Sequence, residues 1–298
     1  MSDHTIYRLL KCLVFCLGAL PAWLANFMAD SLAMIWWHID KRHRRVTLDN
    51  LTHAFGHEMG PRQIESLAKT VFKNLIRMVF EIGWTYSIDR ETLLSHFTFK
   101  GIENIKAAQA KGKGVLAVTG HLGNFEMLIL AVAQLDMDGY GIYRTLDFAP
   151  LEKLMLEARQ RFEVTMLPMR GLSKKLEELL GQGAGVGTLM DQNVDWYKGV
   201  FVEYFGRPAC TNRGLASLAL KTDATVIPFY TVRQNRKFII EYLPEIPLVR
   251  TGDPIKDVEI NTQNFTSAIE SMVRRYPEQY FWVHNRWKTK NYCPYPPN

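Results

Sequence analysis

The stretch Gly114-Val-Leu-Ala-Val-Thr-Gly-His-Leu-Gly-Asn-Phe-Glu126 decides how the rest of the chain is arranged. Residues 115–118 form a short apolar run between glycines, which predicts a buried strand. After Glu126 an unbroken apolar segment continues to Ala133, long enough with its flanks to form a buried helix. This order places His121 at the carboxyl end of a strand and Glu126 in or near the first turn of the next helix. Ligand sites of α/β sheets gather at that edge.

From residue 97 onward the same alternation of strand and helix repeats. We predict strands at residues 98–100, 115–118, 141–143, 164–167, 186–190, 200–205, 226–232 and 238–243. We predict helices near residues 103–111, 124–135, 150–162, 172–181, 212–221 and 261–275. The alternation predicts an α/β fold with a largely parallel central sheet flanked by helices.

The amino-terminal segment is the most apolar part of the chain. No charged residue lies between Cys12 and Ala29, and Pro21 interrupts this stretch. Its length is near the lower limit for crossing ~30 Å of hydrocarbon. A basic cluster at residues 41–45 follows, but cations also precede the stretch, so the orientation stays open. We expect a membrane anchor at residues 1–40, either spanning or in the membrane plane, with a buried helix as the alternative. An α/β domain at 41–298 would follow, with a helical lead-in at about 46–95.

Composition narrows the class of protein. The 298 residues are 47% hydrophobic, which excludes general disorder. A net charge of +6 is too small to predict nucleic-acid binding but suits an anionic membrane surface. The four cysteines have no metal-ligand spacing, so we expect reduced thiols and no metal site.

The spacing of His121 and Glu126 suggests acid–base chemistry. On one helix the two residues would lie roughly 140° apart and would not meet. With His121 in the turn and Asn124 as a possible N-cap, the Glu126 carboxylate could fold back and fix the imidazole tautomer. The turn contains no serine or cysteine, so a substrate hydroxyl would supply the proton. Free amides of Gly123 and Asn124 could stabilise an oxyanion. Alternatively, Glu126 is a first-turn glutamate favoured by the helix dipole.

Polar residues follow the other predicted strands. Arg144, and more weakly Arg170, could bind phosphate through the guanidinium fork, or could be ordinary surface arginines. Asp191 and Gln192 could bind sugar hydroxyls or organise the arginines, or could cap a loop.

Near the carboxyl end, His284 and Arg286 alternate with aromatic residues between positions 281 and 287. Such a segment suits an interface of lipid headgroups. It could also be a structural helix whose tryptophans pack into the core.

Several of these blocks resemble one known family. The block His121-Leu-Gly-Asn-Phe-Glu126 is similar to the H-x-G-N-x-[D/E] signature of the membrane-bound acyltransferases of lipid A biosynthesis, the lauroyl/myristoyl type. Tyr143-Arg144, Asp191-Gln192 and the segment 277–288 match later blocks in the same order. Asn285 departs from the second arginine that the family usually has beside Arg286.

This resemblance implies an O-acyltransferase at the cytoplasmic face of the inner membrane. Acyl carrier protein would donate the acyl chain to a hydroxyl of a lipid A precursor, a glycolipid. His121 would be the general base and Glu126 its partner, and no metal or organic cofactor would be needed. The expected substrate-binding residues are Gly123, Asn124, Arg144, Arg170, Asp191, Gln192, His284 and Arg286.

Two alternatives remain open. The acceptor could be another glycolipid or a lysophospholipid, although the Phe-Pro-Glu-Gly-Thr block typical of glycerol-phosphate acyltransferases does not occur. The chain could also bind lipid at a membrane without turnover. The glycine-rich run 181–187 precedes a predicted strand instead of following it, so we do not expect a dinucleotide site.

Overall fold

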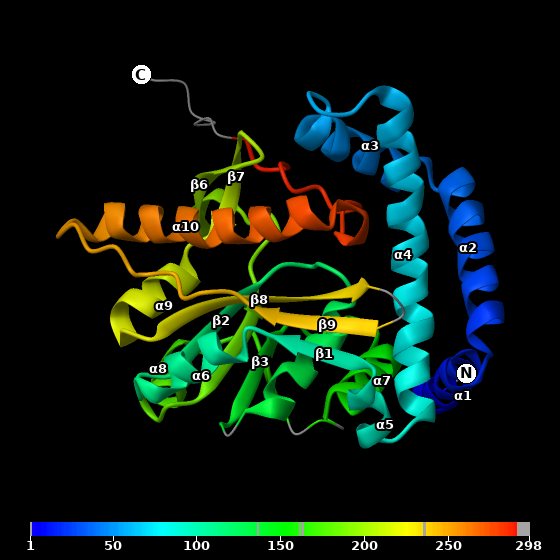
Figure 1. Cartoon of the computed structure of the whole chain (residues 1–298), viewed down its shortest axis with the longest axis horizontal. Helices are drawn as coiled ribbons and strands as arrows, with labels where there is room; N and C mark the ends of the chain where they lie inside the picture. The colour runs from blue at the N-terminus through cyan, green and yellow to red at the C-terminus, as the bar shows by residue number, and fades with distance from the viewer. Residues whose placement is uncertain (1, 136, 161, 163, 235–236, 291–298) are drawn as a thin grey trace.

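The computed structural model describes residues 2–135, 137–160, 162, 164–234 and 237–290, and Figure 1 shows a central sheet flanked by helices. The strands of this sheet are β1 (Phe97–Lys100), β2 (Val115–Thr119), β3 (Gly139–Tyr143), β4 (Thr165–Pro168), β5 (Gly185–Leu189), β8 (Thr225–Gln234) and β9 (Lys237–Tyr242). Their order is β1-β9-β8-β2-β5-β3-β4, and every neighbouring pair is parallel except β8 and β9. The predicted α/β fold with a largely parallel sheet is therefore confirmed.

A separate hairpin contains the strand that sequence patterns missed. The predicted strand at 200–205 is β6 (Gly199–Tyr204), and it pairs antiparallel with β7 (Arg207–Asn212). The β7 segment contains Pro208 and ends in polar residues, so it lacks the usual composition of a strand. Tertiary contacts therefore decide its conformation.

Helices cover both faces of the sheet. On one face, Leu116 and Val118 of β2 share a hydrophobic core with α8 (Ser173–Gly181), α9 (Gly214–Thr222) and α10 (Pro254–Arg275). On the other face, Val115 shares a second core with α6 (Ile102–Ala110) and the 3₁₀ helix η1 (Phe125–Gln134). Helix α7 (Ala149–Gln160) precedes β4. Successive residues of β2 point to opposite faces, as in a strand buried on both sides.

The amino-terminal helices stand at one side of the sheet (Figure 1). Helix α1 (Asp3–Gly18) and helix α2 (Ala22–Ile39) meet at an angle of 118° and both pack on α4 (Pro61–Ser87). At the crossing of α1 with α4, a Cβ added to Gly18 would lie 2.0 Å from the carbonyl oxygen of Gly83. Only glycine permits this approach of the two backbones. Helices α3 (Lys41–Phe55) and α5 (Arg90–Ser95) complete this part of the chain.

The predicted apolar stretch is thus broken at Pro21 into two helices. One side of the pair packs on α4, with Ala29, Ala33 and Trp37 buried. Other apolar side chains stay exposed on the two helices: Leu9, Leu13, Phe15, Trp23, Phe27, Leu32, Ile35 and Ile39. Among the described residues, no single helix is long and apolar enough to cross a membrane, while α1 and α2 together pass by length and composition.

Candidate active site

His121 is bonded to a carboxylate from the neighbouring strand. Strands β2 and β5 are parallel and paired, so the residues that follow them meet at the same edge of the sheet. His121 Nδ1 lies 2.7 Å from Asp191 Oδ1, and the His121 backbone N–H donates to Asp191 Oδ2 at 2.8 Å. The Asp191 side chain is 1% exposed and the imidazole 16%. The carboxylate therefore holds both the backbone and the ring of one residue.

The charges of this pair shift both pKa values. Burial lowers the pKa of His121, but the charge and hydrogen bond of Asp191, with a contribution from Glu126, outweigh burial and raise it above the ordinary value. Burial raises the pKa of Asp191, but His121 outweighs burial and holds that pKa well below its usual range. The site therefore favours an ionised carboxylate beside an imidazole that readily takes a second proton.

The tautomer of His121 follows from its partners. Because Asp191 is an acceptor, Nδ1 carries the hydrogen and Nε2 carries the lone pair. The amide nitrogen of the exposed Gln192 lies 3.2 Å from Nε2 and can donate to it. A substrate hydroxyl that displaced this amide would find a proton acceptor at Nε2.

Glu126 has a different partner from the one its spacing suggested. Arg159 of α7 donates from Nε and from a terminal nitrogen to the two oxygens of Glu126, both at 2.8 Å. The Arg159 guanidinium also lies over the ring of Tyr143, at 5.5 Å from its centroid. The predicted contact of Glu126 with the imidazole is therefore corrected, since Asp191 occupies that place. A bidentate pair that is about 15% exposed on each side holds Glu126 instead.

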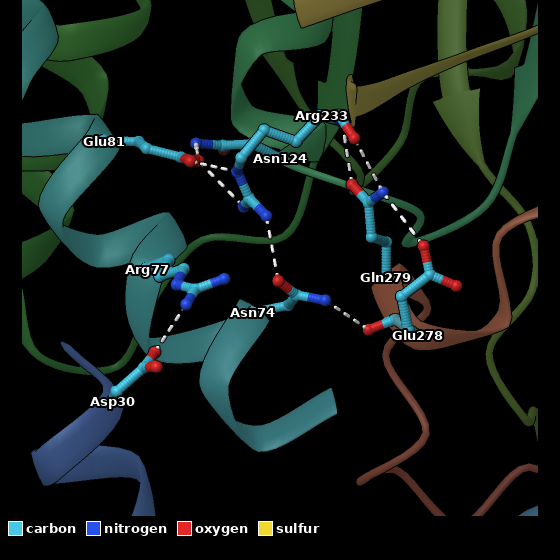
Figure 2. A network of polar contacts seen from close by, with 8 residues as sticks. All are labelled: Asp30, Asn74, Arg77, Glu81, Asn124, Arg233, Glu278 and Gln279. Atoms are coloured by element: carbon cyan, nitrogen blue, oxygen red, sulfur yellow. Dashed lines mark hydrogen bonds and ion pairs between the residues drawn. The ribbon is translucent and has the colours of Figure 1, made fainter. Parts of the chain in front are cut away.

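The turn after His121 is tightly packed, and the Gly123 amide that we expected to be free is engaged. Gly123 has φ +62°, and a Cβ there would lie 1.9 Å from the carbonyl oxygen of Thr231. Its N–H donates to the Gln279 carbonyl oxygen at 2.9 Å, so this amide is not free for an oxyanion. The Asn124 side chain is buried and donates to Glu81 of α4 at 2.9 Å, as Figure 2 shows. Both residues thus shape the turn. The predicted oxyanion role of the Gly123 amide is corrected, and that of the Asn124 backbone amide stays a prediction.

A cavity of about 460 Å³ opens beside this turn. The polar residues of its lining, which we call the rim, include His121, Glu126, Arg144, Arg159 and Gln192. Its interior follows β2 from Thr119 to Val115, roughly 13 Å at the ordinary rise of a strand. The interior is lined mainly by apolar side chains and glycines, among them Leu128, Ile129, Met137, Ile142, Met166, Gly185, Gly187 and Phe229.

Glycines create much of this interior space. A Cβ on Gly187 would have its nearest contacts at 3.8 Å, in ordinary van der Waals range. A Cβ on Gly185 would approach Met137 to 2.9 Å, and one on Gly141 would approach Met166 to 2.8 Å. Gly185 and Gly187 belong to the glycine-rich run that sequence patterns left without a role. Because glycine has no side chain, these two residues leave room for the cavity on one face of β5.

The two candidate phosphate-binding arginines lie in different places. Arg144 follows β3 on the rim of the cavity, is 81% exposed, and pairs with Asp147 at 3.8 Å. Arg170 follows β4 and is exposed, outside the residues that line the cavity. Arg144 is therefore the better placed of the two to meet a ligand at the rim.

The carboxyl-terminal basic residues are part of the packed core. Arg286 is 1% exposed and donates to the Cys210 carbonyl oxygen at 3.0 Å and to the Thr211 hydroxyl. Its guanidinium also lies 5.2 Å from the centroid of the Tyr204 ring. The predicted contact of Arg286 with lipid headgroups is therefore wrong, because the side chain is enclosed by the β6–β7 hairpin.

His284 and the neighbouring tryptophans follow the packing alternative. His284 Nδ1 lies 2.8 Å from the Phe281 carbonyl oxygen, and burial lowers the pKa of this imidazole. Trp282 and Trp287 are 1% and 4% exposed. The segment is not the helix that this alternative assumed, since residues 281–290 form turns and bends.

Sequence reasoning missed the partners of the site. Arg159 lies on a helix of mixed charge, where a single arginine carries no local signal. Gln279 lies in the segment 277–288, in which the motif match assigns it no role of its own. Glu81 and Arg233 come from distant parts of the chain, and only the folded structure brings them to the turn.

The fold and site define an α/β protein that holds a carboxylate-bonded histidine at the rim of an apolar cavity, a class suited to chemistry on lipid-like molecules. The chain belongs to the bacterial lipid A biosynthesis acyltransferase family, whose model matches residues 2–289. It is therefore an acyltransferase by family.

Curated relatives agree with this assignment. The chain is similar to a lipid A biosynthesis lauroyltransferase of Escherichia coli (strain K12), 27% identical over 84% of this chain and 80% of that protein. A lipid A biosynthesis acyltransferase of Haemophilus influenzae is 26% identical over 92% of this chain and 85% of its own length. A phosphatidylinositol mannoside acyltransferase of Mycobacterium tuberculosis is 23% identical over 63% of this chain and 58% of its own length.

Proposed function

We propose that this protein transfers a fatty acyl chain from the thioester of acyl carrier protein to a hydroxyl of a lipid A precursor. The observation that supports this most directly is the His121–Asp191 pair at the rim of an apolar cavity. The family and the lipid A acyltransferases among its relatives support the acceptor class.

In this proposal His121 is the general base. Nε2 takes the proton of the acceptor hydroxyl as the oxygen attacks the thioester carbonyl. Asp191 keeps the hydrogen on Nδ1 and stabilises the imidazolium that forms. The new C–O bond forms, the C–S bond breaks, and the imidazolium returns the proton to the departing thiolate of the carrier. The products are an ester, a free carrier thiol and a neutral histidine.

The rest of the cavity has two further roles. The interior would hold the acyl chain, because apolar burial stabilises a bound hydrocarbon by ~25 cal/mol per Å². Glu126, held by Arg159, adds negative charge near the imidazole and so favours the imidazolium. Arg144 on the rim would bind phosphate of the donor arm or of the acceptor.

The direct test uses the purified full chain with a loaded acyl carrier protein and a lipid A precursor. We expect release of the carrier thiol together with an acylated acceptor in the mass spectrum. His121→Ala should lower turnover by about 10²-fold or more, a typical contribution of a general base. His57→Ala, at an exposed histidine, should have no effect. Turnover near the wild-type level in folded His121→Ala would exclude the mechanism. A carrier that stays loaded would favour lipid binding without turnover.

The exposed apolar side chains of α1 and α2 support a second part of the proposal. Trp23 and Ile39 are 71% and 76% exposed, which is costly in water for side chains of this size. We place this surface in the cytoplasmic leaflet of the inner membrane, with the α/β domain on the cytoplasmic side. Salt screens basic residues but not apolar contacts, so a high-salt wash should leave the protein on isolated membranes. Recovery in the soluble fraction would contradict this placement.

A different glycolipid acceptor remains the second candidate. The similarity to phosphatidylinositol mannoside acyltransferases favours it, because those relatives are named for another acceptor. Mass spectrometry of total lipid A from a strain that lacks this protein separates the two. A missing acyl chain would identify lipid A as the acceptor, and an unchanged lipid A would favour the alternative.

A further inference from the structure

The turn that carries His121 is held on one side by the carboxyl-terminal segment. The Phe281 N–H donates to the His121 carbonyl oxygen at 3.0 Å. The Gly123 N–H donates to the Gln279 carbonyl oxygen at 2.9 Å. These backbone bonds hold the turn at His121 and Gly123, but they do not involve the Asn124 side chain.

On the other side, the carboxylate of Glu81 on α4 meets the turn (Figure 2). Asn124 donates to Glu81 Oε2 at 2.9 Å, and the Arg233 guanidinium binds both carboxylate oxygens. Glu81 and Arg233 are 16% and 20% exposed, so this ion pair is mostly shielded from water. The Glu81 carboxylate therefore accepts hydrogen bonds from both the turn and the end of β8.

The two sides are joined through Arg233. The backbone N–H of Arg233 donates to Gln279 Oε1 at 2.8 Å, and Gln279 Nε2 donates to the Arg233 carbonyl oxygen at 3.0 Å. Asn74 of α4 accepts from Arg233 at 3.0 Å and donates to the Glu278 carbonyl oxygen at 2.7 Å. The contacts form a closed frame of α4, β8 and the carboxyl-terminal segment, and Asn124 ties the turn to this frame through Glu81 (Figure 2).

We infer that Glu81 is a positioning residue, whose carboxylate fixes Asn124 and thereby places His121 against Asp191 and the cavity. The reason is the number of acceptor atoms that a carboxylate offers at this position. Three N–H groups, two from Arg233 and one from Asn124, converge on the two oxygens of Glu81. An amide at this position would offer one oxygen and would point its own N–H groups at the other donors.

The same helix provides a matched control. Arg77, one helical turn before Glu81, donates to Asp30 of α2 at 2.7 Å. Asp30 and Arg77 are 33% and 30% exposed. This pair joins two helices but has no contact with the active-site turn in the described network (Figure 2). Replacing Asp30 thus disturbs a similar ion pair without touching the frame.

The first test is hydrogen–deuterium exchange on the purified full chain. In Glu81→Gln we expect faster exchange in peptides that cover residues 120–126, whereas Asp30→Asn should leave these peptides at the wild-type rate. Small misplacements of reacting groups cost roughly 10²-fold in rate. Because the inference rests on the proposed function for this effect, we expect kcat for acyl transfer to fall by that order in Glu81→Gln. Its KM should change by less than about threefold, and Asp30→Asn should keep both constants.

A second variant keeps the test decisive if Glu81→Gln does not fold. Asn124→Ala preserves the Glu81–Arg233 pair and removes only its bond to the turn, and the same faster exchange is expected. The double variant should lose little more than Asn124→Ala alone, because both changes act through one contact. Unchanged exchange in folded Asn124→Ala, or equal losses in Asp30→Asn, would overturn the inference. Exchange is measured without substrate. A failure to transfer acyl groups would therefore contradict the proposed function without affecting the exchange result.

Discussion

The rim and the interior of the cavity are built from the same strands but from different parts of them. The rim takes polar groups from residues that follow the strands, such as His121 after β2 and Arg144 after β3. The interior is lined by residues from within the strands, such as Val115, Ala117 and Gly187. The residues of the rim can carry charge because they lie outside the core of the sheet. Changes at the rim should therefore alter rate and pH dependence, and changes in the interior should alter which acyl chain fits.

The largest loss of activity is expected from a change at Asp191, the partner of the rim residue His121. Asp191→Asn removes the charge that raises the pKa of His121, and it should lower kcat by about 10²-fold or more. A general base works only when it is neutral, so a raised pKa places the acid limb of kcat/KM at higher pH. Without Asp191 the pKa of His121 falls, and the acid limb should move to lower pH. The measurement is the pH profile of kcat/KM.

Asp195→Asn provides the control for this profile, because Asp195 lies in the same loop and is exposed. It should leave both rate and profile unchanged. An acid limb that stays in place in Asp191→Asn would show that this carboxylate does not set the charge of the base.

An intermediate effect is expected inside the cavity at Gly187. Gly187→Val places two methyl groups in space where a Cβ alone has only ordinary contacts. A hydrophobic pocket distinguishes one methylene by about 10-fold or more in kcat/KM. We therefore expect the ratio of kcat/KM for long over short acyl thioesters to fall about tenfold, with an unchanged pH profile. Gly181→Val, where a Cβ would meet nothing within 4 Å, should keep the wild-type ratio. An unaltered chain preference in Gly187→Val would place the acyl chain elsewhere.

The smallest effect is expected at the outermost part of the rim. Contacts of exposed charges are weak, so Arg144→Ala should raise the KM of one substrate by roughly threefold to fivefold at low salt and leave kcat unchanged. Arg144→Lys keeps the charge but loses the fork, so it should stay impaired. Arg170→Ala, also at an exposed arginine but outside the cavity lining, is the comparison. Equal behaviour of the two alanine variants would make Arg144 an ordinary surface residue.

Local patterns were sufficient for most of the fold. Alternating apolar runs and turn residues located the strands of the large sheet and most of its helices to within a few residues. They failed for β7, where Pro208 and polar residues hide a strand that tertiary pairing stabilises. They also failed for the segment around His284, whose aromatic side chains fill the core without forming a helix.

At the site, the sequence by itself determined where the reactive histidine and the acidic residues stand along the chain. It placed His121 and Asp191 each at the carboxyl end of a strand because hydrophobic periodicity is a local property. Only the tertiary structure decided which carboxylate meets the imidazole, since that depends on β5 lying beside β2 in the sheet. The packing of α7 likewise decided that Glu126 pairs with Arg159. Strand order and helix packing are set by contacts between distant residues, and no short stretch of sequence contains that information.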